Sequence, residues 1–82
     1  MLLWGSNAMS YKVNVVIEKD SYGYYAYSPE LEGCQSEGES YEEVLANIRE
    51  AIALYLETLT EEERLAVVSR EIVTASLEVS IA

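Results

Sequence analysis

The side chains able to act as nucleophiles are few in this sequence. Nucleophilic catalysis needs a Ser, Thr or Cys activated by a nearby base, and histidine, the usual base, is absent from all 82 residues. The single cysteine, Cys34, has Glu30, Glu32 and Glu37 as sequence neighbours, and nearby negative charge makes a thiol a poorer nucleophile. We therefore expect Cys34 to be a small packed side chain, and no residue to be catalytic.

Carboxylates are plentiful and could in principle hold Mg²⁺ for a nuclease. Only Asp20 is an aspartate, however, and the glutamates fall on predicted turns and helix faces, so solvated surface charge is the favoured interpretation. One cysteine without histidine cannot make a zinc site. Gly23, Gly33 and Gly38 are isolated and do not form a phosphate-binding loop. We expect no metal and no cofactor, with a residual metal-dependent nuclease as the less favoured alternative.

The charge balance restricts the class of partner. Fifteen acidic residues against five basic ones give a formal net charge of −10. Binding to a phosphate backbone or an anionic membrane needs clustered Lys and Arg, so neither is expected. An acidic surface can instead steer a basic protein partner, although charge that serves only solubility would look the same in composition.

A cluster of tyrosines lies in one short stretch, at positions 22, 24, 25 and 27. In a strand, Tyr25 and Tyr27 share one face, and Tyr22 and Tyr24 share the other. One pair can enter the core, which leaves the other exposed or covering something. Exposed tyrosine beside acidic residues is typical of protein interfaces. Stacking on nucleic-acid bases is the alternative, which the shortage of Lys and Arg disfavours.

These observations locate a candidate interface at the tyrosine-rich hairpin and at its exit. The residues we expect to contact a protein partner are Asp20, Tyr22, Tyr24, Glu30 and Glu32.

Three strands are expected before the first helix. Residues 11–18 alternate apolar and polar side chains, which predicts a strand with one buried face. Residues 19–21 supply turn chemistry, and residues 22–28 predict the returning strand of a hairpin. Pro29 ends that strand, and residues 34–37 could add a third strand that completes a meander.

Two helices follow. Ser40 is a good N-cap, and Glu43 three residues later predicts a capping box. A single apolar stripe at helical spacing should lie across the sheet; its members are Tyr41, Val44, Leu45, Ile48, Ala51, Ile52, Tyr55, Leu56 and Leu59. Thr60 and Glu63 repeat the capping chemistry and predict a shorter helix that ends at about Val68.

The segment 72–81 alternates again, with Val73, Ala75, Leu77, Val79 and Ile81 on one face. It predicts a strand that either closes the sheet or pairs with another subunit. The expected fold is therefore α+β: a three-stranded antiparallel meander plus a C-terminal strand, with one long helix packed on the sheet.

The chain is expected to form a single domain over residues 9–82. Residues 1–8 resemble an expression-derived scar, because Gly5-Ser6-Asn7-Ala8 precedes a natural start at Met9. A domain of this size has a marginal core, and one cysteine allows no internal disulfide. We therefore expect a homodimer or higher homo-oligomer. Without a signal peptide or an apolar run long enough to cross a bilayer, a cytoplasmic location is expected.

Two consecutive stretches carry a family resemblance. Residues 25–38 hold a strand ending in Pro29-Glu30-Leu31-Glu32-Gly33-Cys34, and residues 40–52 hold the capped helix Ser40-Tyr41-Glu42-Glu43-Val44-Leu45-Ala46-Asn47-Ile48-Arg49-Glu50-Ala51-Ile52. Together they resemble the HicB-like antitoxin family, whose pattern is a Pro-x-Leu-x-Gly-Cys turn followed by a capped Glu-Glu-Ala-x-x-Asn-x-x-Glu-Ala-Ile helix. Val44 replaces the more usual Ala, and Glu32 stands where Pro is common.

The resemblance implies a β-β-β-α-β domain, described as a degraded ribonuclease-H-like fold without its metal carboxylates, and no enzymatic activity. It implies binding to a basic HicA-type toxin, an RNA-cleaving protein whose active site the antitoxin blocks. Many members add a C-terminal DNA-binding segment; this chain ends after the predicted strand, so we expect partner neutralisation without direct binding to nucleic acid. A homo-oligomeric scaffold or binding domain with an unknown partner is the alternative.

Overall fold

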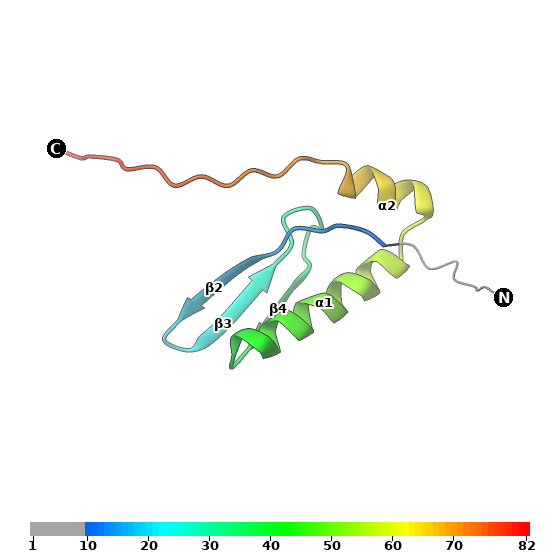
Figure 1. Cartoon of the computed structure of the whole chain (residues 1–82), viewed down its shortest axis with the longest axis horizontal. Helices are drawn as coiled ribbons and strands as arrows, with labels where there is room; N and C mark the ends of the chain where they lie inside the picture. The colour runs from blue at the N-terminus through cyan, green and yellow to red at the C-terminus, as the bar shows by residue number, and fades with distance from the viewer. Residues whose placement is uncertain (1–9) are drawn as a thin grey trace.

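The computed structural model describes residues 10–82, and the prediction about residues 1–8 lies outside them. Three antiparallel strands in the order β2-β3-β4 form a sheet, a long helix covers one face, and a short helix and an extended C-terminal segment follow (Figure 1). The elements are β2 (Val16–Asp20), β3 (Gly23–Tyr27), β4 (Gln35–Gly38), α1 (Tyr41–Glu57) and α2 (Glu61–Val68).

The predicted hairpin is confirmed. Asp20 pairs with Gly23 across a two-residue turn, and the Asp20 carboxylate accepts a hydrogen bond of 2.8 Å from the backbone N–H of Tyr22. Asp side chains favour such turns because they bond to the backbone two residues on. Gly23 has a φ of 138°, which L side chains rarely adopt.

The first strand begins later than predicted, at Val16 instead of Tyr11. The register pairs Val16 with Tyr27, so residues before Val16 would need partners beyond the end of β3. That stretch begins with Ser28 and Pro29, and proline lacks the N–H that a ladder requires. The chain turns there instead, which leaves residues 11–15 beside the sheet without a ladder.

Both helices start at the predicted caps. Ser40 accepts from the backbone N–H of Glu43, but the Glu43 carboxylate accepts from the N–H of Glu39 and not of Ser40, so the predicted reciprocal box at α1 is wrong by one residue. At α2 the box is complete between Thr60 and Glu63. Within residues 10–82, neither helix has the length and hydropathy that crossing a membrane would require.

The core lies between α1 and the sheet and is small. The fully buried apolar side chains are Ala26, Leu31, Cys34, Val44 and Ile48. Two of the five, Leu31 and Cys34, come from the turn between β3 and β4, where the N–H of Cys34 donates to the carbonyl of Leu31 at 3.0 Å. Two core side chains therefore come from a turn and not from a strand or a helix.

The predicted α+β class is confirmed, and the predicted C-terminal strand is not part of this sheet. Residues 71–82 are extended, pair with no strand in the described chain, and lie clear of the helix-covered sheet (Figure 1). Periodicity alone predicts a strand, but a strand also needs a neighbour with a free edge that the segment can reach.

Close packing at Gly38 gives the first prediction. A Cβ at this position would lie 2.6 Å from the backbone N of Val44 and 2.9 Å from its Cα, so β4 can approach the start of α1 only with glycine there. We expect Gly38→Ala to lower the free energy of unfolding in urea by about 1–3 kcal/mol, the usual cost of overpacking.

Gly33→Ala is the matched control, because a Cβ there meets open space and the cost comes only from the positive φ of 81°. That cost is about 1–2 kcal/mol. The two variants differ in kind: Gly38→Ala should also shift the amide resonances of the first turn of α1, and Gly33→Ala should not. Unchanged α1 resonances in Gly38→Ala would contradict the close contact.

Candidate partner-binding surface

A cleft lies at the end of the sheet where β2 turns into β3. This hairpin-end cleft has a volume of about 430 Å³. Its lining comes from the turn, the end of β4 and the first turns of α1, and consists of Asp20, Tyr22, Gly23, Tyr24, Tyr25, Glu37, Gly38, Glu39, Glu43 and Asn47. Pairing of Gly38 with Tyr24 brings these three elements together.

Four carboxylates and no basic side chain line the hairpin-end cleft. The carboxylates of Asp20 and Glu43 stabilise the fold, because they accept hydrogen bonds from backbone N–H groups of the turn and of the α1 cap. The carboxylates of Glu37 and Glu39 accept no hydrogen bond from any part of the described chain, and both residues are exposed. The cleft therefore presents negative charge that a cationic side chain of a partner could neutralise.

The tyrosines divide between the two faces of the sheet. Tyr25 and Tyr27 share one face, as predicted, with ring centroids 5.9 Å apart, and this is the face away from α1. Tyr24 is half-buried on the helix side, with the ammonium of Lys19 5.6 Å from its ring centre. Tyr22 lies in the turn and not in the strand, and it is 94% exposed. A large aromatic side chain this exposed beside four carboxylates suits a protein contact.

The five predicted contact residues do not lie together. Asp20, Tyr22 and Tyr24 line the hairpin-end cleft, whereas Glu30 and Glu32 belong to the turn at the opposite end of β3. Glu32 is exposed there.

Glu30 is 4% exposed, and both of its carboxylate oxygens accept from Asn14. The backbone N–H of Asn14 donates at 2.8 Å and its side-chain amide at 3.0 Å. This pair ties residues 11–15 to the turn, beyond the point where the β2–β3 ladder ends.

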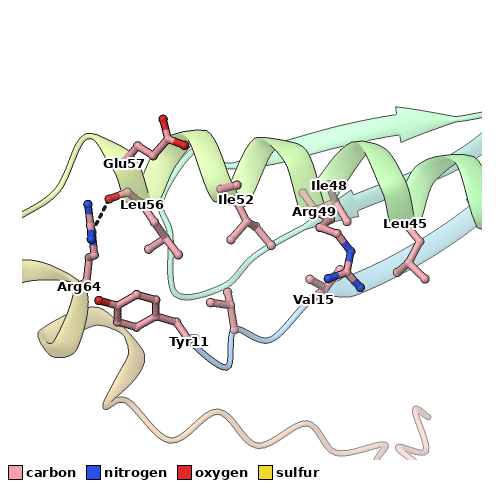
Figure 2. A pocket seen from close by; sticks show the side chains of 11 residues that line it. Tyr11, Val15, Leu45, Ile48, Arg49, Ile52, Leu56, Glu57 and Arg64 are labelled. Carbon is pink, nitrogen blue, oxygen red and sulfur yellow. Dashed lines mark hydrogen bonds between the residues drawn. The ribbon is translucent and has the colours of Figure 1, made fainter. Parts of the chain in front are cut away.

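A second hollow, the edge groove, runs between residues 11–15 and the flank of α1 (Figure 2). It has a volume of about 420 Å³ and is lined mainly by apolar side chains. Leu45, Ile52 and Leu56 project from α1 toward Tyr11 and Val15 (Figure 2). Arg49 and Arg64 also line it, and the Arg64 guanidinium donates to the carbonyl of Leu56 at 2.7 Å.

The one thiol of the chain lies outside both hollows. Cys34 is a buried free thiol, and burial raises the pKa of that thiol, so it carries little thiolate at neutral pH. Residues 10–82 contain no group of three or more Cys, Asp or Glu side chains arranged to hold a metal ion.

Sequence reasoning missed three of the cleft carboxylates, Glu37, Glu39 and Glu43. Alternation in β4 places Glu37 on a known face, but only the antiparallel register brings it opposite Tyr25. The cap at Ser40 was a usable signal for Glu39 and Glu43, because it fixes where α1 begins and hence which end of the sheet it meets.

Comparisons with known proteins agree in pointing to one family. Residues 11–79 match the model of the HicB-like antitoxin of bacterial toxin–antitoxin systems. A UPF0150 protein of Helicobacter pylori is 49% identical over 70 residues, which cover 85% of this chain and 97% of that protein.

Two further relatives are more distant. A UPF0150 protein of Synechocystis is 46% identical over 55 residues, covering 66% of this chain and 70% of the relative. A UPF0150 protein of Archaeoglobus fulgidus is 47% identical over 47 residues, covering 56% and 68%. No solved structure matches the chain significantly. The chain belongs to the HicB-like antitoxin family, as its Pro-x-Leu-x-Gly-Cys turn and capped helix predicted.

Two glutamates in one turn give the second prediction. Glu30→Ala removes both acceptors of Asn14 and leaves a partly buried backbone N–H without a partner. We expect the free energy of unfolding in urea to fall by about 1–3 kcal/mol. Glu32→Ala, two residues away and exposed, should change it by less than about 0.5 kcal/mol. Equal effects of the two substitutions would remove the structural role assigned to Glu30.

Proposed function

We propose that this chain is an antitoxin that neutralises a HicA-type, RNA-cleaving toxin by binding it directly and covering its active site. Membership of the HicB-like antitoxin family supports the antitoxin role. The observation that carries the direct-binding step is the hairpin-end cleft, where four carboxylates surround the exposed ring of Tyr22. A toxin that grips RNA needs basic side chains, and these complement such a surface.

We choose the residues proposed to contact the toxin by the groups that each side chain exposes. Tyr22 supplies aromatic area, and Glu37 and Glu39 supply carboxylates that no other described group engages. Asp20 and Tyr24 complete the same cleft. Glu32 could be reached only by a partner that extends along the sheet to the opposite turn, so it belongs to the outer limit of the interface.

The mechanism requires no chemistry from the antitoxin itself. Binding occludes the toxin by mass action, so inhibition should be stoichiometric and reversible, without turnover. We propose a non-enzymatic protein that acts in the cytoplasm as a homodimer or higher homo-oligomer. Electrostatic steering by the net charge of −10 would raise the rate of encounter with a basic toxin.

The third prediction tests the cleft. A HicA-type protein encoded beside this gene would be purified and titrated with the full chain, and both binding and RNA cleavage would be measured. The double reversal Glu37→Lys/Glu39→Lys should weaken binding by tenfold or more, which is about 1.4 kcal/mol or more. Tyr22→Ala should cost about 2 kcal/mol if the ring is an anchor of the interface.

The matched control is Glu61→Lys/Glu62→Lys, the same charge change on exposed residues of the first turn of α2, far from the cleft (Figure 1). It should bind nearly as the unmodified chain does. Equal weakening by both double reversals would mean that net charge and not the cleft controls binding. If every cleft variant inhibits the toxin as well as the unmodified chain does, the interface lies elsewhere. If the unmodified chain does not bind the toxin at all, a homo-oligomeric scaffold is favoured.

A further inference from the structure

The C-terminal tail, defined as residues 71–82, has the composition of a strand but no strand to pair with. Val73, Leu77, Val79 and Ile81 are 74–92% exposed, and they lie on one face of the extended chain. The tail contains neither Gly nor Pro, so every residue in it can donate to a ladder. A row of exposed apolar side chains on an extended, unpaired backbone is unfavourable in water, so we expect another protein surface to bury it.

The β2 edge of the sheet is open to a fourth strand. Backbone groups in a strand point alternately to its two sides. The backbone N–H and carbonyl of Asp20 point toward Gly23, and the N–H of Asn14 points toward Glu30, so both residues face the β3 side. The N–H and carbonyl groups of Ile17 and Lys19, at the intervening positions of β2, therefore face the open edge. An extended segment could pair with β2 at this edge and continue beside residues 12–15, which belong to no strand.

The edge groove lies next to this open edge and would receive the apolar side chains of such a segment. α1 packs over β3 and β4, so its flank with Leu45, Ile52 and Leu56 overhangs the β2 side, where these side chains are only half-buried. Val13 and Val15 form the facing wall. An added strand whose apolar face points to α1 would fill the groove while its polar face remains in water.

The basic side chains near the β2 edge favour an acidic segment as the added strand. Lys12 lies in the segment beside the open edge, and Arg49 and Arg64 line the edge groove together with one carboxylate, Glu57, so basic side chains outnumber acidic ones there. The tail carries only acidic charges, at Glu71 and Glu78. A basic toxin would meet repulsion at this edge, whereas the tail of this same protein would not.

We propose that two copies of the chain exchange their tails, so that residues 72–81 of each copy pair along the β2 edge of the other and bury their apolar face in its edge groove. Figure 1 shows the tail running from α2 in the same general sense as β2, so pairing with its own β2 from there would be parallel. A copy related by a two-fold axis perpendicular to the strands presents its tail antiparallel to β2, as the other pairs of this sheet are.

The size of the exchanged surface fits a stable dimer. Each copy would contribute its tail and the lining of its edge groove, about twenty residues, and standard interfaces involve roughly 20–30 residues a side. Arg70 anchors the base of the tail by donating to the carbonyl of Pro29 at 3.2 Å, which directs the following residues away from the body. The inference does not rest on the proposed toxin, because its test uses the chain alone.

Sedimentation equilibrium of the full chain should give twice the chain mass. Isotope-filtered nuclear Overhauser spectra of a refolded mixture of labelled and unlabelled copies should show contacts between the methyl groups of Leu77 or Val79 in one copy and those of Val13 or Ile52 in the other. A monomer mass at every concentration would overturn the proposal. So would a dimer whose intermolecular contacts join tail to tail, or whose tail contacts are all within one chain.

A matched pair of variants separates the two faces of the tail. Leu77→Asp/Val79→Asp puts two charges on the apolar face and should halve the mass to that of a monomer. Ser76→Asp/Ser80→Asp adds the same charge to the polar face and should leave the dimer intact. Far-ultraviolet circular dichroism of each variant reports whether the helices persist. Dimers in both variants, or monomers in both with the helices retained, would contradict burial of the apolar face.

Discussion

Burial of the turn between β3 and β4 beneath α1 is the contact on which the rest of this domain depends. Leu31 and Cys34 reach the side chains of Val44 and Ile48, and three backbone hydrogen bonds among Ser28, Leu31 and Cys34 close the turn. The backbone bonds satisfy polar groups that enter the core with the side chains, which would otherwise cost free energy. Leu31 and Cys34 are two of the five buried apolar side chains of the described core, so the turn is a large share of it.

A core this small leaves much of the helix and sheet to be covered from outside. A single helix is about as wide as two strands, and α1 packs over β3 and β4, so the β2 side of the molecule stays thinly covered. The pair formed by Asn14 and Glu30 compensates in part, because it holds residues 11–15 against the turn where Pro29 ends the ladder. That arrangement creates both the open edge and the apolar groove beside it.

The features visible in the sequence were those with local causes. Alternation gave the hairpin, Ser40 and Thr60 gave the helix starts, and the Pro-x-Leu-x-Gly-Cys turn gave the family. Features that depend on distant residues were not accessible. Glu30 seemed a surface charge because its partner, Asn14, lies 16 residues away. Alternation in residues 72–81 defined an apolar face, but local pattern cannot say which edge that face meets.

The position of the charges separates what the two hollows can bind. The hairpin-end cleft has four carboxylates without a basic side chain, and the edge groove has two arginines and one carboxylate, Glu57, among apolar residues. Since the whole chain carries only five basic residues, the presence of two of them in one groove is a local departure from its acidic character. Two copies with a charge of −10 each repel at long range, so self-association needs such a local reversal together with apolar burial. Because the cleft and the groove have different linings, a basic partner and a second copy of the chain can be bound without competing for the same side chains.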